Sequence, residues 1–483
     1  MLGDDISDSL LLGDGTADSL FTVGEATPGM ELFGTAGIRG PVEETVTPEL
    51  ALSVGRAVGR EAETVVVGRD GRQSGSALAA AVEAGVESAG ARVRRLGQVP
   101  TPTLAWASRG RYGVMLTASH NPPEDNGIKL FVDGVEFDGD AEDRIERRVE
   151  GGLEPVPWDE WGTVERADVL GAYREAIVEY ARGHGRPLDG LGVAIDCGNG
   201  MASLATPQVL YELGAEVRAL NANVDSHFDA RGSKPTPETL TGLREFVAAH
   251  DAVELGIGHD GDADRIVIVD GDGAIVHEDT VLAILAEHYV SASDAADPVV
   301  LTTPNASERI DERVAAAGGR IERTGLGVLH EGIAEIRATA ADGTAVVFAA
   351  EPWKHVHPQL GGWIDGVASA AVFARLVAAN GLETLREPVT ERPYRKDPVR
   401  CPDAHKSAVM DRLETRLPEA FPGAEATLDY GVRLSFPDGA WTLVRPSGTE
   451  PYVRIYVESE AADELLADVQ SVVEATVSEI DQT

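Results

Sequence analysis

Residues 64–70 read Thr-Val-Val-Val-Gly-Arg-Asp, an apolar β-strand that runs into a polar turn. An alanine-rich helix follows, and a Gly-Ala hinge at Gly90 and Ala91 leads into a second apolar strand. The same order of strand, turn, helix, glycine hinge and strand recurs in the stretches that begin at Gly192 and at Pro298. Glycine is a frequent helix stop because it adopts the left-handed conformation without a Cβ penalty. The repetition predicts three tandem α/β domains of similar topology with mixed sheets.

The C-terminal part of the chain has a different pattern, which begins at about residue 392. A helix over residues 404–417 is followed by strands around residues 432–436 and 452–457, and an amphipathic helix runs from about residue 461 to residue 480. This order predicts a smaller α+β domain. We therefore expect an acidic N-terminal extension at residues 1–30 and domains at residues 31–165, 166–277, 278–390 and 391–483.

The composition is strongly acidic and poor in lysine. The formal net charge is −40, and only five of the 41 basic residues are lysines. In ordinary salt such a charge opposes compaction, whereas at molar salt the Debye length falls to roughly 3 Å and the penalty largely disappears. We infer a cytoplasm of high ionic strength, as in an extreme halophile. The charge also argues against a nucleic-acid partner, because phosphate backbones would be repelled.

The cysteines and the apolar runs indicate a cytoplasmic protein. Cys197 and Cys401 are the only cysteines and have no metal-like spacing, so a reducing compartment is expected. No apolar run approaches the roughly 20 residues that span a bilayer, so no membrane partner is expected. Residues 1–30 lack the basic segment that opens a signal peptide.

Residues 260–265 read Asp-Gly-Asp-Ala-Asp-Arg and lie between two apolar runs at residues 253–258 and 266–269. Side chains at i, i+2 and i+4 of an extended segment point the same way, so the three carboxylates converge. Converging carboxylates repel unless a cation lies between them, and hard oxygen ligands suit Mg²⁺. An EF-hand loop is excluded, because Arg265 and Gly271 stand where it requires glycine and glutamate. A solvated acidic turn is the alternative interpretation.

Residues 117–123 read Thr-Ala-Ser-His-Asn-Pro-Pro and follow an apolar strand, which exposes Ser119 at a strand end. A structural turn explains the prolines, but it does not explain why His120 and Lys129 converge on the same place. The segment has no Gly-x-Ser-x-Gly elbow, so a hydrolase triad is not favoured. A serine that carries a phosphoryl group fits a nearby Mg²⁺ loop better.

Residues 445–451 read Arg-Pro-Ser-Gly-Thr-Glu-Pro between two strands. Gly448 permits a tight backbone that points successive amides inward, and Ser447 and Thr449 add hydroxyl donors. Arg445 is suited to gripping a phosphate with two parallel hydrogen bonds. The segment predicts a phosphate clasp, and a hairpin with capping hydroxyls is the alternative.

These three motifs, in this order and at these distances, resemble those of the α-D-phosphohexomutases, which include phosphoglucomutase/phosphomannomutase and phosphoglucosamine mutase. The resemblance covers the chain from about Leu32 to its end. Residues 33–40, Phe-Gly-Thr-Ala-Gly-Ile-Arg-Gly, look like the opening signature of the family. Residues 68–72, Gly-Arg-Asp-Gly-Arg, resemble its next signature.

The resemblance implies four domains around a deep cleft, which supply in chain order a phosphoserine, a metal site, a sugar site and a distal phosphate site. Ser119 would be the phosphoserine and would hold Mg²⁺ together with Asp260, Asp262 and Asp264. Arg265 would face the phosphoryl group or the sugar, while Arg39 and Lys129 would assist proton transfer or neutralise the reacting phosphate. His120 is a further candidate proton carrier. The distal phosphate would be held by Arg445, Ser447, Gly448 and Thr449.

The third domain departs from the family pattern. The family usually presents Gly-Glu-x-Ser-Gly-His to read the sugar hydroxyls, and residues 350–355 read Ala-Glu-Pro-Trp-Lys-His. Glu351 and His355 keep their places and are expected to contact substrate. Trp353 would stack on a sugar face, narrow the pocket or pack on Pro352. The departure leaves the mutase chemistry intact and leaves the identity of the hexose open.

The sequence thus predicts an isomerase-class phosphomutase that interconverts hexose 1-phosphate and hexose 6-phosphate, of glucose or mannose, through a phosphoserine and a bisphosphorylated sugar. The resemblance implies Mg²⁺ as cofactor, a hexose 1,6-bisphosphate as activator and sugar phosphates as ligands, and we expect a monomer or a dimer. Phosphoglucosamine mutase is the alternative substrate assignment. A Mg²⁺-dependent sugar phosphatase and a non-catalytic sugar-phosphate binding protein are the more remote alternatives.

Overall fold

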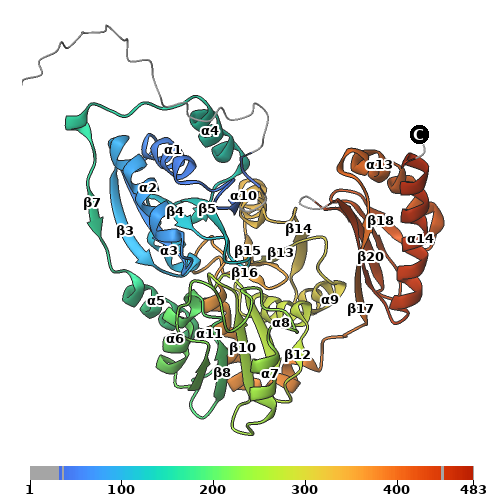
Figure 1. Ribbon diagram of the computed structural model, residues 1–483. Coiled ribbons are helices and arrows are strands. Elements are labelled where there is room, and N and C mark those ends of the chain that lie inside the picture. The colour runs from blue at the N-terminus through green and yellow to red at the C-terminus, as the bar shows by residue number, and fades with distance from the viewer. Residues whose placement is uncertain (1–31, 35–36, 448–450, 482–483) are drawn as a thin grey trace, which may run out of the picture. The chain divides into compact units, whose positions relative to one another are not determined.

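The computed structural model describes residues 32–34, 37–447 and 451–481. Within these residues four β-sheets follow one another along the chain, with the helices and strands labelled in Figure 1. The first three sheets combine parallel strands with an antiparallel strand, and the fourth is entirely antiparallel. This arrangement confirms the predicted α/β class with mixed sheets and a smaller α+β domain at the C-terminal end.

The first sheet is built around the buried strand β2, Thr64–Arg69, whose continuous apolar run suits a strand covered on both faces. Its strand order is β1-β5-β4-β2-β3-β7, and β6 pairs with β5. The other strands are β1 Ile38–Pro41, β3 Arg92–Gln98, β4 Tyr112–Leu116, β5 Asp125–Val132, β6 Val135–Glu136 and β7 Val164–Arg166. The helices are α1 Pro48–Gly59, α2 Gly75–Ser88, α3 Thr101–Ala107 and α4 Gly139–Glu150.

The second sheet has the order β12-β11-β10-β8-β9, with β8, β9 and β10 parallel and β11 antiparallel to β10. Its strands are β8 Gly192–Asp196, β9 Glu216–Leu220, β10 Leu255–His259, β11 Ile266–Asp270 and β12 Ile275–Val276. The helices here are α5 Leu170–Arg182, α6 Thr206–Glu212 and α7 Thr241–Ala248. All residues of β10 and β11 are buried, so the loop between them begins and ends inside the protein.

The third sheet has the order β14-β13-β15-β16 and shares a hydrophobic core with the second. That core contains Ile257 of the second sheet and Phe348 of the third, and α5, α8 (Glu278–Ser291) and α11 (Gly366–Asn380) contribute residues to it. The strands are β13 Asp297–Thr302, β14 Arg320–Arg323, β15 Thr344–Glu351 and β16 Lys354–Val356. The helices are α8 Glu278–Ser291, α9 Glu308–Ala316, α10 Leu329–Thr339, α11 Gly366–Asn380 and α12 Leu382–Arg386.

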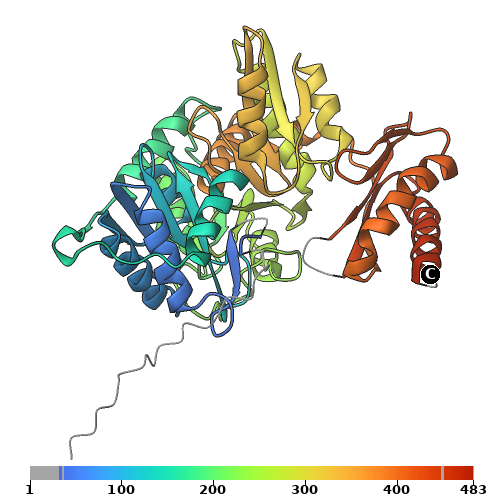
Figure 2. The same cartoon turned by 90° about the horizontal axis from the view of Figure 1, so that it is seen from above.

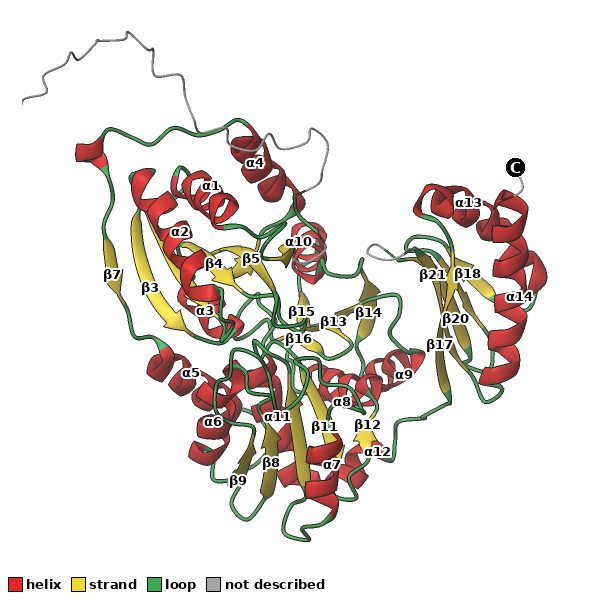
Figure 3. Ribbon diagram, viewed as in Figure 1, coloured by secondary structure: helices red, strands yellow, loops and turns green. Residues whose placement is uncertain are grey.

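The fourth sheet has the order β17-β21-β20-β19-β18 and a core of its own, to which α13 and α14 contribute. Both helices lie on one face of this sheet (Figures 2 and 3). The strands are β17 Tyr394–Arg400, β18 Glu425–Thr427, β19 Val432–Ser435, β20 Trp441–Pro446 and β21 Tyr452–Glu458. The helices are α13 Asp403–Ala420 and α14 Ala462–Asp481. Among the described residues, no helix has both the length and the apolar character needed to cross a membrane.

Candidate active site

Three loops that the sequence singles out occupy the same position in their sheets. Each connects the last parallel strand of its sheet to the adjacent antiparallel strand: residues 117–124 join β4 to β5, residues 260–265 join β10 to β11, and residues 352–353 join β15 to β16. The repeated topology therefore places three functional loops at one equivalent point of three domains. The fourth predicted loop joins the antiparallel strands β20 and β21.

Ser119 is held in a strained, buried position beside the second domain. Its φ is 52°, in the left-handed region that non-glycine residues rarely adopt, and its side chain is fully buried. The Ser119 hydroxyl donates a hydrogen bond to Asp260 Oδ2 at 2.7 Å, and its backbone N–H donates to Thr117 Oγ1 at 2.9 Å. Such strain persists only where the surroundings fix it, which is common at functional sites.

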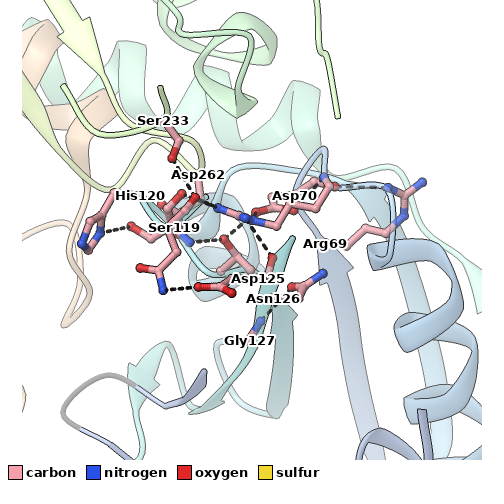
Figure 4. A network of polar contacts seen from close by, with 12 residues as sticks. Arg69, Asp70, Ser119, His120, Asp125, Asn126, Gly127, Ser233 and Asp262 are labelled. Atoms are coloured by element: carbon pink, nitrogen blue, oxygen red, sulfur yellow. Dashed lines mark hydrogen bonds and ion pairs between the residues drawn. The ribbon is translucent and has the colours of Figure 1, made fainter. Parts of the chain in front are cut away.

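The surroundings that fix this loop come from Arg72 and from Asp70, and Figure 4 shows Asp70 close to Ser119. Arg72 is 1% exposed and donates to the carbonyl oxygens of Ser119 at 3.0 Å, Asn121 at 2.8 Å and Asp125 at 2.9 Å, and also to that of Pro122. Asp70 accepts from Arg72 Nε at 3.0 Å and from the Thr117 hydroxyl at 2.7 Å. Sequence reasoning assigned no role to either residue, although the Gly-Arg-Asp-Gly-Arg motif at the end of β2 was the available signal.

The three aspartates of residues 260–265 converge as predicted. Asp260, Asp262 and Asp264 are buried, and each offers an oxygen within 4.8 Å of the oxygens of the others. Asp262 Oδ1 and Asp264 Oδ1 are buried without a hydrogen-bond partner. Buried carboxylate oxygens of this kind require a cation or a proton, so the donor set fits Mg²⁺.

Close packing joins the aspartate loop to the serine loop. A Cβ atom at Gly261 would lie 2.6 Å from the carbonyl oxygen of Ser119, so only glycine allows this approach. On the other side, the Thr101 hydroxyl donates to Asp262 Oδ2 at 2.6 Å. The Ser119 loop and the aspartate loop are therefore in direct contact.

The aspartates differ in the environment of their charges. Burial, followed by the charges of Asp264 and Asp262, raises the pKa of Asp260 well above its usual range. Burial alone would also raise the pKa of Asp264, but the charges of Lys129, Lys354 and Arg265 hold it below its usual range. The like charges thus favour the protonated form of Asp260, and a cation held between the carboxylates would relieve the same repulsion.

The predicted cations surround this loop. Lys129 Nζ on β5 lies 3.2 Å from Asp264, 3.6 Å from Glu136 and 3.9 Å from Asp262. Burial alone would lower the pKa of Lys129, and these carboxylates instead raise it, so Lys129 stays charged. Arg265 Nε lies 3.6 Å from both Asp260 and Asp264.

Arg39 and His120 lie near the same loop. Arg39, on β1, has a buried Nε without a hydrogen-bond partner. His120 Nδ1 is 3.3 Å from the Ser119 hydroxyl oxygen. Burial, followed by the charges of Arg265 and Arg39, lowers the pKa of His120 to about 2. His120 is therefore neutral near pH 7, while Arg39 remains cationic.

The β15–β16 hairpin separates the predicted sugar-binding residues. Glu351 pairs with Lys354 across the hairpin and accepts a hydrogen bond from the Gly327 N–H. His355 pairs with Ala350 and is buried against Ser369, with Nδ1 3.1 Å from the Ser369 oxygen. Successive strand residues point to opposite faces, so Glu351 and His355 do not share one. The prediction that both contact the sugar stays open for Glu351 and receives no support for His355.

Trp353 makes a contact that the sequence did not suggest. Its indole packs against an apolar cluster of the second domain that includes Val267 and Val269, and its exposure is intermediate. Trp353 has a φ of 72°. The side chain fixes the hairpin to the neighbouring domain, and this contact depends on tertiary structure that no local pattern reveals.

The predicted phosphate clasp lies at the end of β20. Arg445 donates to the Tyr456 hydroxyl at 2.8 Å and to the Pro446 carbonyl at 3.2 Å, and its Nε has no hydrogen-bond partner. Ser447 is buried, and its carbonyl oxygen accepts from Lys406, a residue that the sequence did not suggest. Gly448 and Thr449 lie outside the described residues. In the described part of the chain, no hydrogen bond or ion pair joins Arg445 or Ser447 to the Ser119 loop.

Family models of known proteins match three segments of the chain. Family models described as phosphoglucomutase/phosphomannomutase match residues 30–155 as alpha/beta/alpha domain I, residues 172–273 as domain II and residues 399–475 as the C-terminal domain. A phosphopentomutase of Thermococcus kodakarensis is 40% identical over 94% of this chain and 100% of its own length. A probable phosphoglucosamine mutase of Methanopyrus kandleri is 42% identical over 93% of this chain and 99% of its own length.

A solved structure agrees in fold over nearly the whole chain. The crystal structure of a phosphoglucomutase/phosphomannomutase family protein from Burkholderia thailandensis superposes with a TM-score of 0.80 at 28% identity. The match covers 93% of this chain and 98% of that one.

Proposed function

Because the chain belongs to the phosphoglucomutase/phosphomannomutase family of α-D-phosphohexomutases, which are intramolecular phosphotransferases of the isomerase class, we propose that it interconverts the 1-phosphate and 6-phosphate of a neutral hexose, glucose or mannose. One observation carries the site assignment. The Ser119 hydroxyl is buried in a strained loop, 2.7 Å from Asp260, beside carboxylate oxygens that lack partners. A serine in that position is suited to carry the phosphoryl group.

Asp260, Asp262 and Asp264 would hold Mg²⁺ together with an oxygen of the Ser119 phosphoryl group. The ion supplies positive charge that stabilises the transferring group, since phosphoryl transfer is catalysed mainly by positioning and electrostatics. The chain's own residues complete this environment. Arg72 fixes the Ser119 loop through four carbonyl oxygens, and Lys129 and Arg265 lie against the aspartates.

The reaction proceeds through two transfers. In the first, the bond from the Ser119 oxygen to phosphorus breaks, the free sugar hydroxyl bonds to the same phosphorus, and a bisphosphorylated sugar forms. We assign the hydroxyl proton to His120, because its Nδ1 lies 3.3 Å from the Ser119 hydroxyl oxygen and the bound phosphates would offset the charges of Arg265 and Arg39 that disfavour its protonated form. The sugar then turns and returns its other phosphate to Ser119. A hexose 1,6-bisphosphate therefore acts as activator, because it restores the phosphoserine.

The remaining predicted residues hold the substrate. Arg445, Ser447, Gly448 and Thr449 would bind the phosphate that is not transferred, and the unpartnered Arg445 Nε supports a free guanidinium donor there. Glu351 would accept hydrogen bonds from sugar hydroxyls. Its hydrogen bond from the Gly327 N–H supports a fixed orientation.

A second candidate function is the same chemistry on another sugar. The similarity to a phosphopentomutase favours a pentose phosphate, and the similarity to probable phosphoglucosamine mutases favours an amino sugar. All three assignments share the phosphoserine, the metal and the distal clasp, so only a comparison of substrates distinguishes them.

The test is a substrate panel assayed with Mg²⁺ in multimolar KCl. Glucose, mannose, glucosamine and ribose 1-phosphates are compared by kcat/KM, with inorganic phosphate measured in parallel. We expect turnover without phosphate release and with the highest kcat/KM for glucose or mannose. Ser119→Ala should abolish turnover, whereas Ser291→Ala, at an exposed serine at the end of α8, should retain it. Full activity of Ser119→Ala would overturn the phosphoserine assignment, and release of phosphate would indicate a phosphatase.

A further inference from the structure

Lys354 lies on the same face of the β15–β16 hairpin as Glu351. The two residues are directly paired across the strands, so their side chains emerge side by side. His355, the next residue, emerges on the opposite face and contacts Phe348 of the core, with 5.6 Å between ring centroids. The register therefore directs Lys354 away from the core.

The hairpin turn is fixed against the metal loop. Trp353 occupies the second turn position with a φ of 72°, a conformation that costs a bulky residue on the order of 1 kcal/mol or more. Three contacts offset that cost: the Trp353 carbonyl accepts from the Ile266 N–H at 3.1 Å, Lys354 forms a backbone bridge with Arg265, and the Trp353 indole packs against the second domain. The backbone of Lys354 thus lies directly beside the last residue of the metal loop.

The positive charge of Lys354 reaches the catalytic groups. Burial alone would raise the pKa of Glu136, and the charges of Lys129 and then Lys354 hold it below its usual range. Glu136 lies 3.6 Å from Lys129 Nζ, and the Lys354 backbone is bridged to Arg265, so Lys354 lies beside the cations that surround the metal loop.

Lys129 and Lys354 differ in whether a carboxylate pairs with their ammonium groups. Lys129 is 2% exposed and lies within 4.0 Å of three carboxylates, which neutralise it. Within the described residues, Lys354 makes no ion pair and no side-chain hydrogen bond. A partly exposed ammonium beside the Ser119 loop, without an anionic partner, is available to an anionic ligand.

We propose that Lys354 is a catalytic residue whose ammonium binds the phosphate group in transfer between Ser119 and the sugar. The inference rests on the proposed function and deepens it. A phosphate monoester brings about two negative charges to a loop that is already acidic. The Lys129 ammonium is already shared among three carboxylates. Lys354 supplies the missing charge from the third domain, so the sugar loop takes part in the chemistry as well as in recognition.

The experiment compares Lys354→Met, Lys354→Gln and Lys354→Arg with the wild type, using glucose 1-phosphate, glucose 1,6-bisphosphate and Mg²⁺. Lys396→Met is the matched control, because Lys396 is an exposed lysine on β17. Removing one charge-assisted contact should lower kcat by about 10- to 100-fold, with a smaller change in KM. Lys354→Arg should recover part of the loss, which a merely structural role would not predict.

The thermal unfolding midpoint with and without Mg²⁺ shows whether each variant is folded. If folded Lys354→Met and Lys354→Gln both keep the kcat of Lys396→Met, the proposal is overturned. A change confined to KM would overturn the role in transfer as well. If the wild type converts no sugar phosphate, the proposed function fails instead, so the two failures are distinguishable.

Discussion

The interior of this protein contains two buried polar regions that are built in opposite ways. The first is the metal loop, residues 260–265, in which carboxylate oxygens face one another and two lack hydrogen-bond partners. The second, here called the neutral chain, joins α5, α8, β16 and α11 through uncharged side chains. Its members are Tyr180, Tyr289, His357, Ser369 and His355.

The direction of each hydrogen bond in the neutral chain follows from the proton of the Ser369 hydroxyl. The Ser369 hydroxyl donates to the Asp365 carbonyl at 2.8 Å, so His357 Nε2 at 2.9 Å and His355 Nδ1 at 3.1 Å must both donate to Ser369. His357 Nδ1 then accepts from the Tyr289 hydroxyl at 2.7 Å, and Tyr289 accepts from Tyr180 at 2.8 Å. Each N–H and O–H of the chain has an acceptor, and, within the described part of the protein, the one buried atom of these five side chains without a hydrogen-bond partner is His355 Nε2, an acceptor.

The comparison shows how buried polar groups indicate function. A satisfied network stabilises one arrangement of the core, because every donor would lose its partner in another. Unpartnered like charges destabilise the folded chain, and they persist where a ligand completes them. The metal loop should therefore respond to ligand and to charge removal, and the neutral chain should respond to neither.

The largest expected effect is that of Asp260→Asn on activity. Loss of one metal ligand should lower kcat/KM by at least about 10³-fold, since the metal supplies several kcal/mol of transition-state stabilisation. Because burial and like charges disfavour the ionised form of Asp260, the variant should be no less stable than the wild type in EDTA. Steady-state kinetics and denaturant unfolding measure the two effects. Asp294→Asn, at an exposed acid, is the control, and a marked loss of stability in EDTA would contradict the comparison.

Magnesium binding should stabilise the folded protein through the metal loop alone. At a concentration about 100 times the Kd, a ligand adds about 2.7 kcal/mol to the free energy of unfolding, which corresponds to a shift of a few degrees in Tm. The wild type should show this shift and lose it in EDTA. Asp260→Asn should not show it, and an equal shift in that variant would place the metal elsewhere.

The sequence predicts the metal loop better than it predicts the neutral chain. Three aspartates at alternate positions between apolar runs define a loop from local spacing alone, and the repeated strand and helix pattern defines the domains that carry it. The neutral chain joins residues from four elements, so only the tertiary fold brings them together. No spacing in the sequence relates Tyr180 to His357 or Ser369.

The β15–β16 hairpin is a second case in which sequence spacing does not predict tertiary contacts. The sequence placed Glu351 and His355 together as sugar contacts, but the two-residue turn pairs Glu351 with Lys354 and turns His355 to the core. Strand register depends on turn length, and a shift of one residue exchanges the faces. Arg72 was missed for a related reason, since its role depends on four carbonyl oxygens more than 45 residues away in the chain.

Breaking the neutral chain should cost stability and leave the metal site intact. Ser369→Ala removes the acceptor of two imidazole N–H groups, and each buried unsatisfied donor costs about 1–3 kcal/mol, so we expect a loss of at least about 2 kcal/mol. The Mg²⁺-dependent shift in Tm should keep its wild-type size. Ser291→Ala serves as the exposed control. A Ser369→Ala protein with unchanged stability but a lost Mg²⁺ shift would reverse the roles that we assign to the two regions.

The smallest expected effect is that of pH on the histidines beside the neutral chain. His184 Nδ1 lies 2.9 Å from His288 Nε2, and the His184 ring lies 4.9 Å from the Tyr180 ring. Burial, followed by the charges of His288 and Arg375, lowers the pKa of His184 to about 4.

Because the folded-state pKa of His184 lies below the unfolded value of about 6.5, its contribution to stability is complete above pH 6.5 and is lost as the pH falls toward 4. The contribution of Asp260 to the pH dependence of stability has the opposite sign. Its pKa is raised in the folded state, so its protonation as the pH falls stabilises the folded protein relative to the ionised form. Between pH 6.5 and 5.5, His184→Gln should therefore lose about 1 kcal/mol less than the wild type, as measured by denaturant unfolding. His227→Gln, at a histidine that is 66% exposed, should follow the wild type. If His184→Gln lost as much as the wild type over this interval, the imidazole pair would not be a buried, neutral extension of the chain.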